Sequence, residues 1–378
     1  MRPTTPADAG AIDRACYIDP VNHPEAATSP RVTTIYVIYP RARGTIGIRG
    51  SHPPLSWERT TPPTRSDGDL YVFEVHVPDG ETLDVKLVRG EEDWAHGRNY
   101  VIHAGDHLHL EPAFDRTSCE LRDPVEIVDG DSRLTYQLLL PPSYGEQDNK
   151  RYPVIYAQDG QALWADSVDP FGVWRLDETL NGLYELAAID EVIVVAINTS
   201  ERRLERLSPV ADPHYGGGDA HEHLRMIADV LKPGLDRELR TKPGPAETAV
   251  MGSSMGGLFS LYAVWNRPDV FGKAICLSSS FWWNNRWLIR SVQTAPSPRP
   301  VIYMDSGAAL NPEEPKPSAH DGFHHTRAMH RALSRAGYTY PELHWLTFPG
   351  HSHGAAAWAA RVTIPLQLLF PPPSVETS

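Results

Sequence analysis

The sequence is poor in cysteine, in long apolar runs and in positive charge. Its three cysteines (Cys16, Cys119 and Cys276) lie far apart with no C-x-x-C pair, which excludes a disulfide framework and indicates a reducing compartment. The longest apolar run, within "EVIVVAIN", is too short to cross a membrane. A net charge of −13 at pH 7 disfavours binding to nucleic acid or to an anionic membrane surface. We expect a protein with neither kind of partner.

Two further absences concern targeting and metals. The first twenty residues contain no apolar segment of the kind that a secretory signal requires, so we expect a cytoplasmic location. The 17 histidines include no H-E-x-x-H pair or comparable ligand spacing. We therefore expect no metal, and nothing in the sequence implies a cofactor.

The first third of the chain carries strand and turn signals only. Residues 1–30 are rich in Pro, Ala, Thr and Asp, which favours a flexible leader. Residues 31–121 contain short β-branched and aromatic runs, such as "RVTTIYVIY" and "YVFEVHVPDG", separated by turn motifs. This spacing predicts an immunoglobulin-like β-sandwich over residues 31–121.

Strands and helices alternate in the remainder of the chain. "RYPVIYAQDG", "EVIVVAIN" and "KAICLSSS" are typical of strands, while "HEHLRMIADVLKPGLDREL" and "HHTRAMHRALSRAG" have helical periodicity. Fully apolar strands separated by helices are typical of a parallel sheet covered on both faces. Residues 122–378 are therefore predicted to form an α/β domain with a mostly parallel sheet.

A serine between glycines stands at one predicted strand-to-helix junction. The pentapeptide Gly252–Gly256, "GSSMG", fits G-x-S-x-G, with "ETAVM" before it as strand and "GGLFSLYAVW" after it as helix. In a nucleophile elbow the serine occupies a strained turn that lifts its Oγ above the sheet, and the glycines avoid Cβ clashes. An ordinary tight turn is the alternative. The coincidence of strand, motif and helix favours Ser254 as a nucleophile.

A nucleophilic serine needs a base and an acid, and in such a fold both follow it in the sequence. His351 and His353 come directly after the predicted strand "ELHWLTFPG", and spacing alone does not choose between them. Four carboxylates follow the preceding strand: Asp305, Glu313, Glu314 and Asp321. Asp321 opens a predicted helix, so it could equally be a helix N-cap.

The oxyanion of an acyl-transfer intermediate needs backbone N–H donors. Met255, directly after the serine, would supply the first donor. Gly160 or Gln161, in the loop after "PVIYAQDG", would supply the second. A simple turn at Asp159-Gly160 is the alternative interpretation.

From about Arg122 to Phe370 the chain resembles the Putative esterase family of α/β-hydrolases, which includes the enterochelin (ferric enterobactin) esterases. The motifs that carry the resemblance occur in order: "RYPVIYAQDGQALW", "WRLDETL", "VIVVAINTSERRLERLSP", "LKPGLDRELRT", "MGSSMGGLFSLYAVWNRPDVFGKAICLSSSFWW" and "FPGHSHGAAAW". The segment before them is similar to the β-sandwich that precedes the hydrolase domain in enterochelin esterases.

The resemblance implies a choice of triad. The family histidine stands five residues before a tryptophan, so Trp358 implies His353, and the family acid lies just before the helix holding "TRAM", which implies Asp321 over Glu313. The Asn-Glu pair that often follows the family histidine is replaced by Gly354-Ala355.

The resemblance also implies substrate contacts. Trp282 and Trp283 in "SSSFWW" would wall a pocket for a ring-bearing substrate, or else pack in the core, and Arg203 would hold an anionic group or remain a surface charge. The implied activity is that of a serine carboxylic-ester hydrolase, acting on a siderophore trilactone or on an acylated carbohydrate. Acyl transfer by the same triad and a non-catalytic binding module are the other hypotheses.

Overall fold

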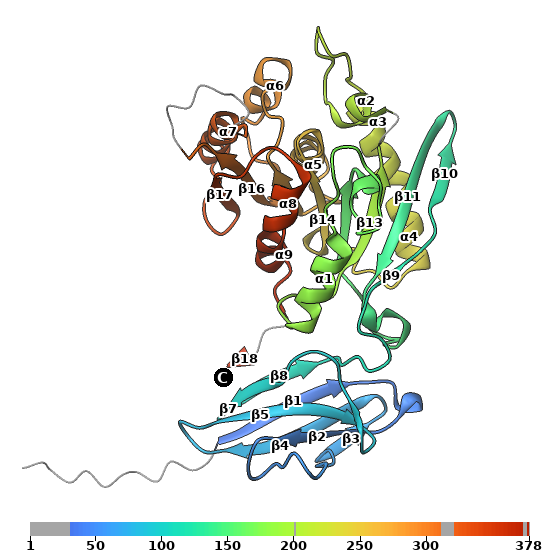
Figure 1. Ribbon diagram of the computed structural model, residues 1–378, viewed down its shortest axis with the longest axis vertical. Helices are drawn as coiled ribbons and strands as arrows, with labels where there is room; N and C mark the ends of the chain where they lie inside the picture. The colour runs from blue at the N-terminus through green and yellow to red at the C-terminus, as the bar shows by residue number, and fades with distance from the viewer. Residues whose placement is uncertain (1–30, 200–201, 311–320, 373–375, 378) are drawn as a thin grey trace, which may run out of the picture.

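The chain forms two units that lie one above the other in Figure 1. The computed structural model describes residues 31–199, 202–310, 321–372 and 376–377. The first unit consists of strands and one short 3-10 turn, and the second is a large sheet with helices on both faces (Figure 1). The predicted leader and the candidate acids Glu313 and Glu314 lie outside the described residues.

The first unit is a pair of sheets around one apolar core. Its strands are β1 (Arg31–Ile38), β2 (Ile46–Gly50), β3 (Arg65–Asp67), β4 (Leu70–Val77), β5 (Thr82–Arg89), β6 (Asp93–Trp94), β7 (Tyr100–His103) and β8 (Asp106–Leu110). One sheet has the order β18-β8-β1-β4-β3, and the other is β2-β5-β6 with β7 also paired to β5. Alternating residues such as Ile35 and Phe73 from the first sheet meet Leu83 and Leu87 from the second in one buried cluster. This is the predicted sandwich.

Two short strands place the boundary between the units differently from the sequence prediction. β9 (Glu120–Leu121) pairs with β11 of the second unit, so the last two residues of the predicted sandwich belong to the other sheet. β18 (Glu376–Thr377) pairs antiparallel with β8, so the chain's end returns to the first unit. Two-residue strands carry almost no periodicity, and their partners are far away in the sequence.

The second unit is built on a mostly parallel sheet, which confirms the predicted fold class. Its order is β10-β11-β13-β12-β14-β15-β16-β17, and only β10 and β11, with β9, are antiparallel to their neighbours. The bounds are β10 (Val125–Asp129), β11 (Ser132–Leu140), β12 (Val154–Gln158), β13 (Ile193–Asn198), β14 (Thr248–Ser253), β15 (Lys273–Leu277), β16 (Val301–Ala308) and β17 (Leu343–Pro349).

Helices cover both faces of this sheet, which explains its uninterrupted apolar strands. Along β12, Val154 and Tyr156 face one buried cluster while Ile155 and Ala157 face the other. The helices are α1 (Leu176–Glu185), α2 (Arg203–Leu207), α3 (Ala220–Arg225), α4 (Lys232–Glu238), α5 (Met255–Asn266), α6 (Trp283–Ser291), α7 (Phe323–Arg335), α8 (Ala355–Arg361) and α9 (Thr363–Leu369). Residues of α1, α8 and α9 fill one cluster, and residues of α3, α4, α5 and α7 fill the other.

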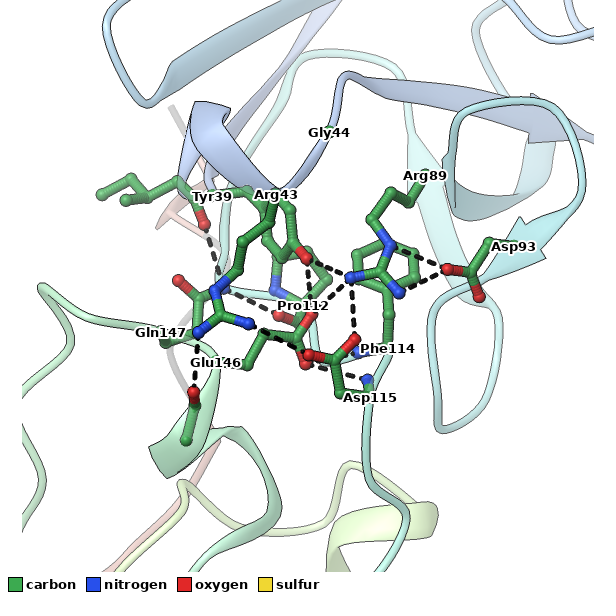
Figure 2. A network of polar contacts seen from close by, with 12 residues as sticks. Tyr39, Arg43, Gly44, Arg89, Asp93, Pro112, Phe114, Asp115, Glu146 and Gln147 are labelled. Carbon is green, nitrogen blue, oxygen red and sulfur yellow. Dashed lines mark hydrogen bonds and ion pairs between the residues drawn. The ribbon is translucent and has the colours of Figure 1, made fainter.

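The two units are joined by a buried carboxylate. Glu146 follows the short 3-10 turn Pro142–Gly145 of the second unit, and it is almost fully buried against the first (Figure 2). Its Oε1 accepts a hydrogen bond from the Tyr39 hydroxyl at 2.6 Å. Its Oε2 accepts hydrogen bonds from the backbone N–H groups of Phe114 (2.8 Å) and Asp115 (3.0 Å). The Arg89 guanidinium lies 3.5 Å from Oε1 and offsets the charge.

Replacing Glu146 with Ala is expected to lower the free energy of unfolding by about 3 kcal/mol, because three buried donors lose their acceptor. Urea denaturation followed by tryptophan fluorescence measures the change. Glu58→Ala, at an exposed position of the same β-sandwich, is the control. Equal denaturation midpoints for the two variants would contradict the importance of this contact.

Candidate active site

Ser254 stands in a strained turn between β14 and α5. Its φ and ψ angles are 55° and −116°, a region that residues with a side chain rarely adopt. Its N–H donates to Leu277 O of the neighbouring strand at 2.9 Å, which holds the turn in place. A Cβ on Gly252 would stand 2.5 Å from the carbonyl carbon of Gly256, so only glycine fits there. The local sequence therefore produces the elbow geometry that G-x-S-x-G predicts.

Ser254, His353 and Asp321 lie in one chain of hydrogen bonds. His353, in the loop before α8, has its Nε2 3.0 Å from Ser254 Oγ. Its Nδ1 lies 2.6 Å from Oδ1 of Asp321, which sits just before α7. The Asp321 side chain is fully buried, whereas that of His353 is 41% exposed. His351 instead places its ring against Phe348, with centroids 5.6 Å apart.

The second oxygen of Asp321 is fully used by buried donors. Asp321 Oδ2 accepts the backbone N–H of Gly307 at 2.6 Å and the Ser278 hydroxyl at 2.5 Å, and Arg361 Nη2 lies 3.4 Å away. Burial acts to raise the pKa of Asp321, but the hydrogen bonds from His353, Ser278 and Gly307 outweigh it and hold that pKa below its usual value. The carboxylate is therefore ionised and can orient a neutral imidazole that is protonated on Nδ1.

Ser278 connects the acid to the helix that follows the histidine. Its hydroxyl donates to Asp321 and accepts from Trp358 Nε1, at 3.0 Å, and from Arg361 Nη2. One donated and two accepted hydrogen bonds fill the capacity of a hydroxyl. Trp358 also places its ring edge-on to the His353 ring, with centroids 5.2 Å apart at 87°. The tryptophan thus contacts both the histidine and the residue that supports the acid.

Asp305, one of the alternative acids, makes its hydrogen bonds and ion pair with a different set of residues. It is fully buried, accepts the Tyr303 hydroxyl at 3.0 Å and the Ser278 N–H at 3.2 Å, and lies 3.1 Å from Arg361 Nη2. Burial raises the pKa of Asp305 to about 6, although Arg361 acts in the opposite direction. Asp305 lies within β16, three residues before the end of the strand, and the partners of its carboxylate are Tyr303, Ser278 and Arg361 rather than His353.

The predicted oxyanion loop lies against the start of α5. A Cβ on Gly256 would stand 3.2 Å from Gln158 Cβ, so the end of β12 and the helix start are in contact. Gly160 passes so close to β13 that its Cβ would stand 2.7 Å from the carbonyl carbon of Ala196. Within the described part of the chain, the N–H groups of Met255, Gly160 and Gln161 have no hydrogen-bond acceptor. These three donors are therefore available to a ligand.

An ion pair fixes the conformation of this loop. Asp159 adopts a left-handed conformation, with φ 58°, and accepts two hydrogen bonds from the Arg203 guanidinium, both at 2.8 Å. The Thr199 hydroxyl donates to the same carboxylate at 2.5 Å. The Arg203 charge, predicted to meet substrate, is directed at Asp159 in this structure. Arg203 thus orders the loop that carries Gly160 and Gln161.

The two neighbouring tryptophans differ in exposure. Trp283 is buried, and its indole N–H donates to Val210 O at 2.7 Å, so it packs in the core instead of forming a pocket wall. Trp282 is 39% exposed, and its ring meets the exposed Tyr215 edge-on, with centroids 5.8 Å apart. Trp282 and Tyr215 together form an exposed aromatic pair. Trp282 lies two residues beyond Ser280, whose hydroxyl touches Ser254.

Sequence reasoning did not assign several of these residues. Ser278 and Ser280 lie in the serine run after β15, and that run at the active edge of the sheet is a signal that could have been used. Arg361 and Tyr215 gave no such signal, because their partners lie far away in the sequence.

A cleft of about 1250 Å³ between the two units is separate from this site. It is lined by residues such as Trp94 and Arg98 of the sandwich and Lys150 and Glu185 of the second unit. Lys150 precedes β12, whereas Ser254 follows β14, and the two strands are parallel. The cleft therefore lies near the opposite edge of the sheet from the triad.

Two kinds of feature are absent from the described residues. No cluster of three or more His, Cys, Asp or Glu side chains suited to a metal ion occurs among residues 31–199, 202–310, 321–372 and 376–377. No helix in those same ranges is both long and apolar enough to cross a membrane.

A doubly covered, mostly parallel sheet with a serine elbow after a central strand defines an α/β-hydrolase fold. The Putative esterase family matches residues 130–363, more than half of the chain, so the chain belongs to that family.

Curated relatives match over part of their length. The chain is 26% identical over 220 residues to the uncharacterized protein YbbA of Bacillus subtilis, covering 57% of this chain and 82% of that protein. It is 28% identical over 158 residues to the siderophore enterobactin esterase of Emericella nidulans, covering 38% of this chain and 52% of that enzyme. The match thus spans about half the length of that esterase.

Among solved structures, the enterobactin esterase FES of Shigella flexneri superposes with a TM-score of 0.50 at 13% identity. The superposition covers 89% of this chain and 92% of that enzyme, which shows that the fold is shared across both units.

A buried neutral histidine contacts the end of β12. His223 Nε2 lies 2.9 Å from Gln158 Oε1 at the end of β12, and its ring packs on Phe259. Burial, helped by the positive charge of Arg206, lowers the pKa of His223 to about 3. The folded state therefore keeps His223 neutral at pH values where the unfolded chain binds a proton.

His223 is therefore expected to make stability fall with acidification. Between pH 6 and pH 4 the unfolded state binds one more proton than the folded state, so His223 contributes a loss of about 1.4 kcal/mol per pH unit. His223→Gln should lack this contribution, whereas His221→Gln, at an exposed position of the same helix, should retain it. Free energies of unfolding measured from pH 4 to pH 8 test this. Equal pH dependence for wild type and His223→Gln would contradict it.

Proposed function

We propose that the protein is a serine carboxylic-ester hydrolase with Ser254 as nucleophile, His353 as general base and acid, and Asp321 as the group that orients the imidazole. The observation that carries the proposal is the continuous hydrogen-bond chain from Ser254 Oγ through His353 to the buried Asp321. Family membership supports the same reaction class.

In the first half-reaction Ser254 Oγ attacks the ester carbonyl carbon while His353 Nε2 takes the hydroxyl proton. The ionised Asp321 stabilises the imidazolium. The carbonyl oxygen becomes an oxyanion that accepts hydrogen bonds from the N–H of Met255 and from that of Gly160 or Gln161. When the bond to the alcohol breaks, His353 returns the proton to the leaving oxygen. The acyl group is then attached to Ser254.

In the second half-reaction a water molecule attacks the acyl carbon and gives a proton to His353. The same N–H donors hold the second oxyanion. Collapse of this intermediate breaks the bond between the carbon and Ser254 Oγ, and His353 protonates the serine oxygen. An alcohol in place of water would give acyl transfer by the same steps.

For the substrate we propose a siderophore ester, of the enterobactin-like trilactone type. One support is the relative from Emericella nidulans, which is named a siderophore enterobactin esterase. The other is the exposed aromatic pair Trp282 and Tyr215 beyond the nucleophile, whose rings suit a planar catechol. A cytoplasmic location is part of the same proposal, and the few, widely separated cysteines support it.

Ser254→Ala is expected to reduce turnover of p-nitrophenyl acetate by at least about a thousandfold, because the covalent step is lost. Asp321→Asn should cause a comparable loss by favouring the wrong imidazole tautomer. Ser253→Ala, the neighbouring buried serine, is the control and should remain active. Circular dichroism checks folding. Undiminished turnover in folded Ser254→Ala would refute the triad, and failure of a fluorophosphonate probe to label wild-type Ser254 would favour a binding module.

A hydrolysis screen separates the substrate classes. Siderophore trilactones are expected to be cleaved with a kcat/KM at least about tenfold above that for acetylated or feruloylated sugars, because only the former present several aromatic rings to Trp282 and Tyr215. Trp282→Ala should reduce trilactone cleavage more than p-nitrophenyl acetate cleavage. Faster cleavage of the acylated sugars would assign the protein to carbohydrate esters. Chromatography of the products shows whether water or an added alcohol receives the acyl group.

A further inference from the structure

A second serine hydroxyl touches the nucleophile. Ser280 Oγ lies 3.1 Å from Ser254 Oγ, and the Ser280 side chain is buried. Its backbone is tied to the same place, because the Ser280 N–H donates to Ser254 O at 2.9 Å and Ser280 O accepts from the Trp283 N–H at 3.0 Å. These backbone bonds fix the position of the hydroxyl independently of its side-chain contact.

The hydrogen-bond capacities of the three residues decide the direction of this contact. Asp321 is ionised and accepts from His353 Nδ1, so Nδ1 carries the imidazole proton and Nε2 has the free lone pair. Ser254 therefore donates its single proton to Nε2. With that proton used, Ser254 Oγ can only accept from its other neighbour. Ser280 is the donor.

We propose that Ser280 is a further catalytic residue, whose hydroxyl donates a hydrogen bond to Ser254 Oγ whenever that oxygen carries developing negative charge. The inference rests on the proposed hydrolase function. Ser280 keeps its own proton throughout. The proton that moves is the one exchanged between Ser254 and His353, and the bond that forms and breaks is the one between the acyl carbon and Ser254 Oγ.

The two half-reactions depend on this donor unequally. During attack, a hydrogen bond to Oγ eases loss of the proton but also weakens the nucleophile, so the two effects oppose each other. During deacylation, Oγ is the leaving group, and a donor that stabilises its charge only accelerates bond breaking. Loss of the Ser280 hydroxyl should therefore slow deacylation more than acylation.

The chain offers a matched control in the adjacent residue. Ser279 is equally buried, and its hydroxyl has no hydrogen-bond partner in the described part of the chain. Ser279→Ala thus removes the same atom from the same segment without removing a contact to Ser254. Ser280→Cys is a second test variant, because a thiol is similar in shape but a weak donor.

The experiment is stopped-flow hydrolysis of a p-nitrophenyl ester whose deacylation limits turnover. For Ser280→Ala we expect kcat to fall about tenfold and kcat/KM to change less than about threefold, with a burst of nitrophenol approaching one equivalent per enzyme. Ser280→Cys should fall between Ser280→Ala and wild type, and Ser279→Ala should match wild type. Thermal denaturation checks that each variant is folded. If Ser280→Ala does not fold, Ser280→Cys is the variant that tests the inference.

Three results would overturn the inference. The first is that the Ser280 variants have the same kcat and the same burst amplitude as Ser279→Ala. The second is an equal decrease of kcat and kcat/KM, which would place the contribution of Ser280 in acylation or in substrate binding. Both leave the hydrolase proposal intact as long as Ser254→Ala is inactive. Full activity of folded Ser254→Ala would overturn the hydrolase proposal and the role of Ser280 together.

Discussion

The candidate site depends on one buried carboxylate, that of Asp321, whose two oxygens contact different sets of partners. Asp321 Oδ1 meets the histidine, and Oδ2 meets Gly307, Ser278 and Arg361. An ionised carboxyl group is stable inside a protein only when such donors replace water. Asp321 and Ser278 both hold left-handed backbone conformations, with φ of 41° and 42°. The surrounding structure must supply the free energy for this strain, of roughly 1–3 kcal/mol per residue.

Buried charge also organises the contacts around the triad. Arg361 stands between Asp305 and Asp321, so two acidic groups share one guanidinium inside the core. Burial acts to raise the pKa of both carboxyl groups. It prevails at Asp305, whereas at Asp321 three hydrogen bonds that favour the charged form outweigh it. Asp321, the residue that touches His353, is therefore ionised down to a lower pH than Asp305.

The sequence predicts those parts of the site that are local. The elbow lies within about ten residues, where strand, glycines and helix agree, so Ser254 and Met255 could be named from the pattern alone. Asp321 and its partner Ser278 are 43 residues apart, and no periodicity joins them. Trp282 and Trp283 are adjacent and identical in type, yet one is exposed and the other buried, because the chain turns between them. Fold class was predictable, whereas the short strands β9 and β18 were not.

The division between buried and exposed parts of the site also explains how one fold can serve several esters. The nucleophile, its hydrogen-bonded neighbours and the N–H donors are held by strand ends that belong to the core of the sheet. Trp282 and Tyr215 lie outside it, on segments that follow β15 and α2, and their exposed rings can change without loss of core packing. A solved structure can therefore share this fold at 13% identity. Under the proposed function, selection for a new acyl group would then act on the aromatic pair, while Asp321, Ser278 and Ser280 remain constrained by burial.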